Sequence, residues 1–414
     1  MIEWSEQHLM MRDAVRRFID AEIVPNLEEF EHGDTPPYDV LRKMFRTFGI
    51  DQVARERFKK QIEAERKAAE AKARGEAPPE KEEDGADQGG ADAAAMRMIP
   101  VIELCRYCPG MVTAMGVSVG LAAGAIRSKG TIAQKERWML ELQTLDKIGA
   151  WAITEPGSGS DAFGGMKATA RRDGDHYILN GNKTFITNGP YADIIVFICK
   201  LDEGNDPAER KIVTFVVEKG MPGLTQSKPM RKMGLHSSPT GELFLDDVRV
   251  GKEYLLGERE EGASREGAKE TFSTERAGVA AMALGMVEQC LKLSVNYAKT
   301  RVQFGRPIGE FQLIQLKLAK MEVARMNIQN LVFRHVELAS EGKRPTLAEA
   351  SAMKLYCAQA AVEVCLEAVQ LFGGNGYMAE FQVEQLCRDA KVLQIYGGTD
   401  EIQISQIARS LMAQ

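Results

Sequence analysis

The spacing of apolar residues changes twice along the chain, and these changes divide it into three parts. Residues 1–150 repeat apolar positions at helical spacing. Residues 151–262 instead contain short β-branched runs separated by turn signals, and residues 263–414 return to the helical spacing. The pattern predicts an α+β fold with an N-terminal helical domain, a central antiparallel β domain that resembles a barrel, and a C-terminal four-helix bundle.

Individual helices and strands can be placed within these parts. A first helix is expected near the N-terminus, with Leu9, Met10, Val15 and Phe18 on its apolar face. Longer periodic stretches and short β-branched runs mark further elements. The predicted strands are 192–201, 211–220 and 243–250, and the predicted long helices are 273–300, 311–341 and 346–371.

One stretch of the N-terminal part, from about residue 58 to 97, differs in composition from its surroundings. Its first half is rich in alanine and charge and can form a solvated helix, while its second half is rich in Pro, Gly and acidic residues. Such a segment buries too little apolar area to offset its ordering entropy. We therefore expect a partly disordered insertion that is poorly ordered beyond about residue 75 and whose deletion is tolerated.

Composition limits the class of function. The 414 residues, 44% of them hydrophobic, are enough for a large core in two or three domains. A net charge of −6 without any basic block argues against a nucleic-acid partner. No apolar run reaches the roughly 18–20 residues of a membrane span, and the N-terminus lacks the composition of a targeting peptide. The expectation is a soluble cytoplasmic protein.

Cysteine and histidine give no pattern typical of a metal centre. The seven cysteines and five histidines are dispersed along the chain. Cys105 and Cys108 form a CxxC pair, but no second pair or nearby histidine completes a zinc site. Reduced, buried thiols are the expected state, and no metal is predicted.

Several glycine-rich motifs are the candidates for chemistry. Taken singly, each has an ordinary structural explanation, such as a Gly/Ser loop or a helix C-terminal stop. Glycine turns also free backbone amides to meet polar ligand atoms. The motifs are AITEPGSGSDAFG at 152–164, KTFITNG at 183–189, STERAGVAA at 273–281, TRVQFGRPIGEFQ at 300–312, QLFGGNGY at 370–377 and IYGGTDEIQ at 395–403.

Together and in this order, the motifs closely resemble those of the acyl-CoA dehydrogenases. The resemblance covers about residues 1–50 and 98–414 and leaves out the insertion. It implies the three-domain fold described above, FAD bound without covalent attachment, and a homotetramer built as a dimer of dimers. It also implies an acyl-CoA substrate, with electrons passed to an electron-transfer flavoprotein.

The resemblance also implies which residues contact the cofactor. One group, from the first two motifs, would lie beside the flavin, where Phe185 replaces a tryptophan common among relatives. A second group would reach the cofactor from a neighbouring subunit. The implied contacts are Trp151, Ile153, Thr154, Ser160, Phe185 and Thr187 in the first group, Arg301, Phe304, Gln312, Gln370, Gly373 and Gly374 in the second, and Thr399 and Glu401 near the C-terminus.

The chemistry of such an enzyme needs a base at the substrate. A weakly acidic α proton must be removed while hydride leaves the β carbon, so the base must be desolvated and close to the α carbon. Most relatives carry the catalytic glutamate where this chain has Gly397, whereas long-chain and isovaleryl-type relatives carry it where this chain has Glu275. The resemblance therefore implies Glu275 as the base. Ser273 or Thr274 is expected to cap the helix that Glu275 would begin.

Substrate contacts are implied in the same way. The backbone amide of Gly397 would donate to the thioester carbonyl, and Arg276 would position the base and the loop. Burial of the carboxylate by the bound acyl chain is expected to raise its pKa. The implied substrate contacts are Ser160, Phe272, Arg276, Gly397 and Gly398.

Two questions stay open at the level of the sequence. The apolar segment 110–126 contains Gly116, Gly120 and Gly124, which fit either an acyl tunnel or tight helix packing. The substrate is expected to carry a medium- to long-chain or branched acyl group. The activity also has alternatives. An acyl-CoA oxidase that uses dioxygen shares the fold, and a catalytically silent relative could act as an interaction protein.

Overall fold

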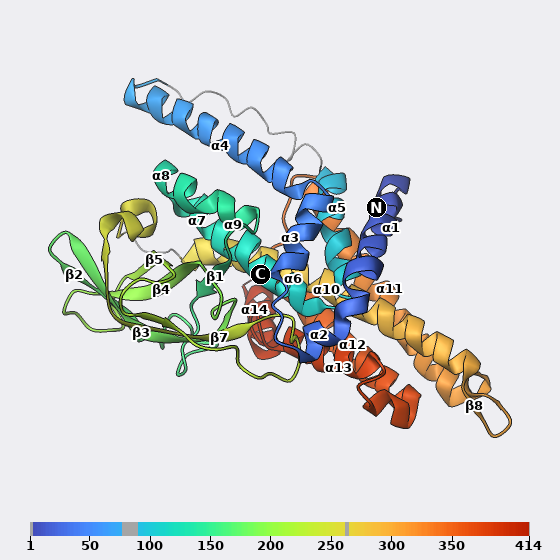
Figure 1. The fold of residues 1–414 in the computed structure, drawn as a ribbon. Helices are drawn as coiled ribbons and strands as arrows, with labels where there is room; N and C mark the ends of the chain where they lie inside the picture. Colours follow the sequence, from blue (N-terminus) through green and yellow to red (C-terminus); the bar gives the residue numbers. More distant parts are fainter. Residues whose placement is uncertain (1–2, 77–89, 261–264, 414) are drawn as a thin grey trace.

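The computed structural model describes residues 3–76, 90–260 and 265–413 (Figure 1). The N-terminal part is helical, as the apolar spacing predicted. Two π-helical turns, Gly116–Ala122 and Lys135–Met139, and the 3₁₀ turn Val24–Asn26 join its helices. The helices are α1 (Glu6–Glu22), α2 (Leu27–His32), α3 (Tyr38–Thr47), α4 (Ile50–Ala73), α5 (Gly90–Leu104), α6 (Pro109–Met115), α7 (Ala123–Lys129), α8 (Ile132–Gln134) and α9 (Leu140–Gln143).

Helix α1 begins with a capping box. The Ser5 side chain accepts a hydrogen bond from the His8 amide, and the His8 ring accepts one from the Ser5 amide. Val15 and Phe18 are buried in the core, as predicted. The prediction was wrong for Met10, whose side chain is 66% exposed, because the buried face of the helix runs through His8 instead.

The inserted region is more ordered at its ends than the composition indicated. Helix α4 includes the charged first half of the region, as predicted. At the other end the prediction was wrong, since α5 is helical from Gly90 and buries Ala94 and Ala95 in the main core. Alanine has a strong helix propensity and fits where helices pack closely. This stretch can therefore form a helix and pack on the core without large apolar side chains. The predicted disorder between residues 77 and 89 lies outside the described residues.

The middle part forms one seven-stranded sheet in the order β1-β4-β2-β3-β7-β6, with β5 paired to β4. All three predicted strands are present. The prediction of an antiparallel sheet was wrong for two pairings, because β4 runs parallel to both β1 and β2. Eight of the nine residues of β4 are buried, as expected for a strand with both faces covered. The strands are β1 (Gly149–Ala152), β2 (Thr169–Asp173), β3 (His176–Thr187), β4 (Ile194–Asp202), β5 (Ile212–Glu218), β6 (Leu224–Gln226) and β7 (Thr240–Gly251).

Apolar side chains line the two faces of this sheet differently. One cluster, which includes Leu179, Phe197 and Phe215, lies inside the curled sheet. A second cluster joins the outer face of β4 and β5 to α7 and to Trp138, so the N-terminal helices cover that face. The sheet is thereby anchored to the helical part of the molecule. The 3₁₀ turns Lys252–Tyr254 and Leu256–Glu258 follow β7.

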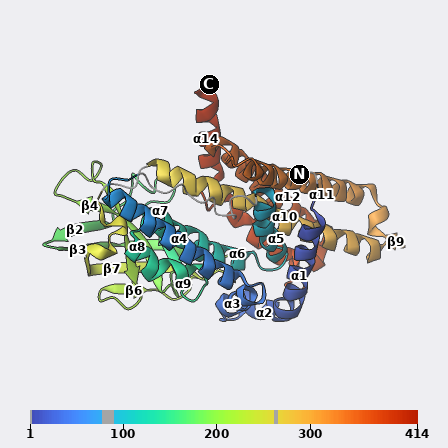
Figure 2. The ribbon, with the colours of Figure 1, turned by 90° about the horizontal axis from the view of Figure 1, so that it is seen from above.

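The C-terminal part consists of long helices that pack on the N-terminal helices through one large core. The three predicted long helices are confirmed, and two shorter helices follow them. A two-stranded hairpin, β8 with β9, lies at the end of the molecule opposite the sheet (Figures 1 and 2). The elements are α10 (Arg265–Thr300), β8 (Val302–Gln303), β9 (Arg306–Pro307), α11 (Gln312–Ser340), α12 (Leu347–Phe372), α13 (Val383–Lys391) and α14 (Asp400–Met412), with 3₁₀ turns at Ile308–Glu310, Gly373–Tyr377 and Val392–Gln394.

Three helical stretches among the described residues are long and apolar enough to cross a membrane, by length and composition only. They are Pro109–Lys129, Gly278–Thr300 and Leu347–Tyr377, and the shares of their apolar windows buried inside the protein are 50%, 67% and 44%. The expectation that no stretch would qualify was therefore wrong on length and hydropathy. Their apolar residues also contribute to the protein cores described above.

Candidate active site

The first group of predicted cofactor contacts lies on or just after two strands, β1 and β3. Trp151 on β1 is half-buried, and Ile153, just after that strand, is buried. The Thr184 amide on β3 donates to the Thr154 carbonyl oxygen over 2.9 Å, which joins the end of β1 to β3. The structure thus brings the first two motifs side by side.

A bulge near the end of β3 turns one aromatic ring outward. The pairing of β3 with β7 shifts register between Lys183 and Ile186. Phe185 sits in this irregular stretch with a φ of 56° and a side chain that is 66% exposed. Left-handed backbone is unusual for a residue with a large side chain and is found most often at functional sites. Thr187, two residues on, is half-buried.

The loop after β1 is open on its outer side. Glu155 and Ser158 form a two-bond bridge at its base. A Cβ added at Gly157 or Gly159 would meet no atom within 4 Å, and neither residue needs a positive φ. Ser160 is exposed beside them. The packing of this chain does not require glycine here, so the two glycines leave room for a ligand to approach the backbone.

A second loop, at Gly397 and Gly398, is held by side chains from three helices. Both glycines have positive φ angles, 62° and 91°. The Gly397 carbonyl accepts from Arg276 Nε at 3.5 Å and from Gln403 Nε2 at 3.1 Å. The Gly398 carbonyl accepts from Lys354 Nζ at 2.9 Å and from Gln403 Nε2 at 2.7 Å. These donors fix the backbone of the loop that the resemblance places against the thioester.

Two of these donors, Lys354 and Gln403, were missed at the level of the sequence. Gln403 ends a motif that was noted for other residues. Lys354 had a signal of its own, since it occupies the buried face of α12 together with Ala350, Cys357 and Ala361. A lysine on an apolar helical face must find a partner, because an unpaired buried cation is costly.

The predicted base lies on helix α10, but its side chain is outside the described part of the structure, as is that of Phe272. The predicted helix cap was wrong, because α10 already begins at Arg265, ten residues before Glu275. The dipole effect is limited to the first turn and therefore does not reach this position. The next residue, Arg276, is buried and donates from Nη1 to Ser351 Oγ over 2.9 Å.

The two predicted cofactor contacts near the C-terminus, Thr399 and Glu401, lie at the start of helix α14. Thr399 caps the helix, and its hydroxyl accepts from the Ile402 amide. Glu401 is exposed in the first turn, where hydrogen bonds from its own backbone amide and from Thr399 hold its pKa below the usual range. A carboxylate is favoured at this position because helix N-termini attract negative charge.

The second group of predicted cofactor contacts lies at the other end of the molecule. A hollow of about 400 Å³ includes Arg301, Phe304, Gly373 and Gly374 in its lining. Phe304 is 91% exposed with a φ of 52°, and a Cβ added at Gly374 would meet no atom within 4 Å. Gln312 and Gln370 are exposed and do not line the hollow.

The two groups do not meet within one chain. The hollow lies beside the β8–β9 hairpin, whereas the first group lies on the sheet at the opposite end (Figure 1). A single ligand bound by both groups would therefore need two copies of the chain.

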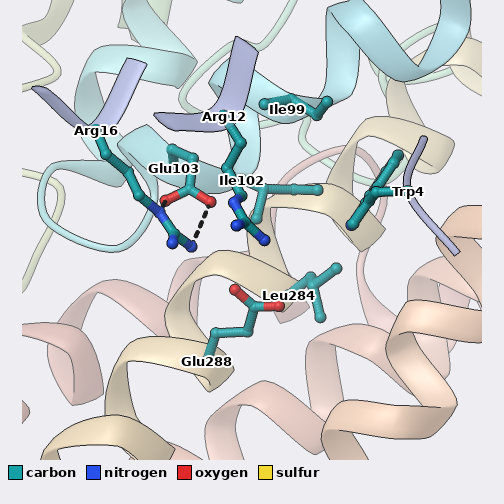
Figure 3. A pocket seen from close by; sticks show the side chains of 8 residues that line it. All are labelled: Trp4, Arg12, Arg16, Ile99, Ile102, Glu103, Leu284 and Glu288. Atoms are coloured by element: carbon teal, nitrogen blue, oxygen red, sulfur yellow. Dashed lines mark hydrogen bonds and ion pairs between the residues drawn. The ribbon is translucent and has the colours of Figure 1, made fainter. Parts of the chain in front are cut away.

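A smaller cavity of about 80 Å³ lies between α1, α5 and α10, where Arg16 and Glu103 form a pair of hydrogen bonds of 2.8 and 3.0 Å (Figure 3). Glu288 also lines it and contacts Arg106 at 3.1 Å. Burial raises the pKa of Glu288. Pockets that bind organic ligands usually have about 300–1,000 Å³, so this charged gap is too small to hold a cofactor.

The cysteines are free thiols, and six of the seven are buried. Among the described residues no three His, Cys, Asp or Glu side chains are grouped so as to hold a metal ion. Burial raises the pKa of the Cys105 and Cys108 thiols well above the usual value, which disfavours the thiolate form that binds metals.

Comparison with known proteins assigns this architecture to one family. Sequence models of the N-terminal, middle and C-terminal domains of acyl-CoA dehydrogenase match residues 5–54 and 50–146, 150–248, and 265–412. The short-chain specific acyl-CoA dehydrogenase of Megasphaera elsdenii is 40% identical over 328 residues, which are 79% of this chain and 84% of that protein. An acyl-CoA dehydrogenase of Bacillus subtilis is 37% identical over 409 residues, 99% of this chain and 98% of that protein.

Solved structures agree with the sequence comparison. Butyryl-CoA dehydrogenase from Megasphaera elsdenii superposes with a TM-score of 0.83 at 34% identity and covers both chains completely. A glutaryl-CoA dehydrogenase from Mycobacterium smegmatis in complex with FADH2 has a TM-score of 0.81 at 27% identity, covering 99% of this chain and 96% of that one. A chain described with the electron transferring flavoprotein of Acidaminococcus fermentans has a TM-score of 0.79 at 32% identity over the whole of both chains.

The three domain matches, the relatives above 30% identity and the shared fold lead to one conclusion: this chain is an enzyme that belongs to the acyl-CoA dehydrogenase family.

Proposed function

We propose that this enzyme binds FAD and dehydrogenates a short acyl-CoA thioester between its α and β carbons. Glu275 takes the α proton, and the loop at Gly397 holds the thioester carbonyl. When bound, FAD supplies the acceptor for the hydride that leaves the β carbon. The product is the trans-2-enoyl-CoA ester.

The observation that carries the proposal is the way in which the Gly397–Gly398 loop is held. Its two carbonyl oxygens accept hydrogen bonds from α10, α12 and α14, so its backbone is fixed before any substrate binds. A preorganised loop of this kind can stabilise charge that develops on a substrate oxygen. Gly397 offers no carboxylate, and the base must come from elsewhere.

Helix α10 is the source that this geometry favours. Arg276 contacts the Gly397 carbonyl, so the backbone of the preceding residue, Glu275, lies close to the same loop. A carboxylate beside a buried arginine can be both oriented and desolvated when an acyl chain covers it. The side chain of Arg276 would then position the base.

The chain also fits FAD. Phe185 offers an exposed ring beside the open loop of Gly157 and Gly159, and Phe304 offers another beside Arg301 in the larger hollow. Arginine and an exposed ring suit the phosphate and adenine portions of a dinucleotide. The solved relative in complex with FADH2 supports this cofactor. Thr399 and Glu401 would contact the flavin end.

We also propose that the cofactor site lies between two copies of the chain. The residues of its two halves are at opposite ends of one chain. Phe304, in the half beside the hairpin, is exposed to solvent. A closed pair of copies would give two equivalent sites. A homotetramer built from such pairs completes the proposal.

Relatives favour a shorter acyl group than the sequence alone suggested. The names short-chain specific and butyryl-CoA dehydrogenase belong to relatives with high identity. Gly116, Gly120 and Gly124 would each meet no atom within 4 Å if a Cβ were added, which supports space for an acyl chain rather than tight helix packing. The solved chain described with an electron transferring flavoprotein supports such a protein as the acceptor. A cytoplasmic location stays part of the proposal and rests on composition.

The replacement Glu275→Gln tests the proposed base. The variant should keep FAD and bind butyryl-CoA, yet reduce the flavin about 10²–10⁴-fold more slowly under anaerobic conditions, because general-base catalysis contributes roughly that much. Flavin bleaching in a stopped-flow instrument measures the rate, and Glu363→Gln, an exposed carboxylate on α12, is the matched control. Unchanged bleaching in Glu275→Gln would reject the base.

Two results on the wild type would favour the alternative functions. Stoichiometric peroxide during aerobic turnover would favour the oxidase alternative, and binding of acyl-CoA without any bleaching would favour a silent interaction protein.

A further inference from the structure

A fully buried lysine lies next to the residues of the first group. Lys183 on β3 has no exposed surface, and its Nζ donates to Glu155 Oε1 at 2.8 Å and to the Ile153 carbonyl oxygen at 3.0 Å. Its ammonium group also lies 5.3 Å from the centre of the Phe197 ring. Burial lowers the pKa of Lys183, and hydrogen bonding to Glu155 opposes that shift. The lysine thus ties β3 to the segment that follows β1.

Its partner, Glu155, closes the open loop on itself. This carboxylate is 5% exposed. Its Oε2 accepts from the Lys167 amide at 2.7 Å, and its Oε1 accepts from the Ala168 amide at 3.0 Å as well as from Lys183. One side chain at the start of the loop therefore holds the backbone at its end. The exposed tip at Gly157, Gly159 and Ser160 lies between these fixed points.

These contacts hold the two segments that the proposed function places against the cofactor. Glu155 directly follows Thr154, whose side chain is half-buried. Lys183 comes two residues before Phe185, whose side chain is exposed. The backbone bond from Thr184 to Thr154 lies between them. Both members of the pair are buried, so the pair acts through the backbone of its neighbours.

We propose that the buried Glu155–Lys183 pair positions the loop at Gly157–Ser160 and the bulge at Phe185, so that the cofactor surface is formed before the cofactor binds. This inference rests on the proposed function for the identity of the cofactor. Preorganisation increases affinity because less ordering is left to occur on binding. A buried ion pair often adds little net stability compared with apolar residues of similar size, so its presence here points to a role in shaping the site.

Removing both charges together gives the sharpest test. A single change would leave an unpaired buried charge and lower stability for that reason alone, whereas Glu155→Leu combined with Lys183→Met replaces the pair by apolar side chains. The double variant of the full chain should unfold at a lower temperature, because the Lys167 and Ala168 amides lose their acceptor, but it should remain folded at the assay temperature and bind FAD about tenfold or more weakly. In cofactor-free protein the amides of Ser158, Gly165 and Thr184, which donate to backbone carbonyls and not to the Glu155 side chain, should exchange hydrogen faster.

A matched control and a rescue separate positioning from stability. Arg172 on β2 pairs with Glu203 and Glu260 in the same domain, and its side chain is 45% exposed. Arg172→Met combined with Glu260→Leu should leave FAD affinity and the three exchange rates unchanged. The single variant Lys183→Arg keeps Glu155 and a donor for it. It should therefore bind FAD more tightly than the double variant. Wild-type FAD affinity and wild-type exchange in the double variant would overturn the inference.

The same measurements distinguish failure of the inference from failure of the proposed function. Hydrogen exchange in cofactor-free protein reports loop order without any cofactor or substrate. If wild-type protein bound no FAD, the proposed function would fail. Faster exchange confined to the double variant would then still support the positioning role, and unchanged exchange would reject it.

Discussion

At the scale of single residues, the junction of the three domains contains an unusual group of buried charges. Glu31 on α2 is almost fully buried, and neither of its carboxyl oxygens accepts a hydrogen bond from the described residues. Arg388 Nη2 and His236 Nδ1 approach one of those oxygens only to 3.8 and 3.7 Å. Burial, and then the charge of Asp389, raise the pKa of Glu31 to about 8. Burial also lowers the pKa of Lys232 to about 8.

This raised pKa predicts a specific dependence of stability on pH. The folded protein keeps the Glu31 proton up to about pH 8, whereas an unfolded chain loses it near 4.5. The folded state therefore binds more protons between these values, and the contribution of Glu31 to the free energy of unfolding is lost as pH rises through the window. Urea unfolding from pH 5 to 8.5 should show wild-type stability falling relative to Glu31→Gln. The exposed Glu28→Gln on the same helix is the control, and parallel pH curves for wild type and Glu31→Gln would contradict the assignment.

At the scale of elements, helix α4 is attached to the domain by a small number of polar contacts beyond its first turns. Lys135 Nζ donates to both carboxyl oxygens of Glu65 at 2.8 Å, and the lysine side chain is only 10% exposed. Arg66 and Glu136 form a second, more exposed pair. Ile62, one turn earlier on the same helix, is buried. The helix thus packs on the domain through these contacts, and we expect a deletion that includes it to lower the free energy of unfolding, whereas composition alone predicted a tolerated deletion.

Two changes on α4 should have different effects. Glu65→Ala leaves the ammonium of Lys135 without its carboxylate in a largely buried position, and we expect a loss of about 1–3 kcal/mol in the free energy of unfolding. Glu63 pairs with Lys67 at 3.0 Å on the exposed side, and Glu63→Ala should leave stability nearly unchanged. Urea midpoints of the two variants measure the difference. Equal midpoints would show that the contact with Lys135 does not anchor the helix.

At the scale of the whole molecule, the arrangement of the two halves of the proposed cofactor site is the main feature. The sheet and the β8–β9 hairpin lie at opposite ends of the chain (Figure 2). Helix α11 also carries exposed large apolar residues in its first half. Exposed apolar surface of this extent commonly marks a protein–protein interface. These residues are Leu313, Leu316, Val323 and Met326.

A shared site predicts complementation between two inactive variants. Arg301→Ala combined with Phe304→Ala disables the half contributed to a neighbour, and Glu275→Gln disables the base of the chain's own site. A mixed pair then contains one site with both defects and one intact site, so random pairing should restore about a quarter of the activity. Turnover per chain in co-expressed protein measures this, with a mixture of separately purified variants as the control. Activity no higher than in that mixture would place the whole site within one chain.

Much of the fold followed from the sequence because its elements are long and periodic. Apolar spacing alone placed α10, α11 and α12, and β-branched runs placed β4, β5 and β7. The Thr184 amide joins the β3 segment of Phe185 and Thr187 to Thr154, while the contacts of these residues with a cofactor stay a prediction. The start of α10 was misplaced because a serine or threonine within a helix has the same appearance as a cap. The order in α5 was missed because alanine contributes little to an apolar pattern, although it packs well between helices.

The sequence by itself determined the three-part division of the chain, the presence of the glycine loops and the absence of a carboxylate at Gly397. Only the tertiary structure decided which side chains hold those loops. Lys183 and Glu155 lie 28 positions apart, and Lys354 and Gly398 lie 44 positions apart, and neither pairing leaves a local pattern in the sequence. Local spacing reports which face of a helix or strand is apolar, because that depends on nearby residues. The partner of a buried charge depends on how distant elements fold together, and only the folded chain specifies it.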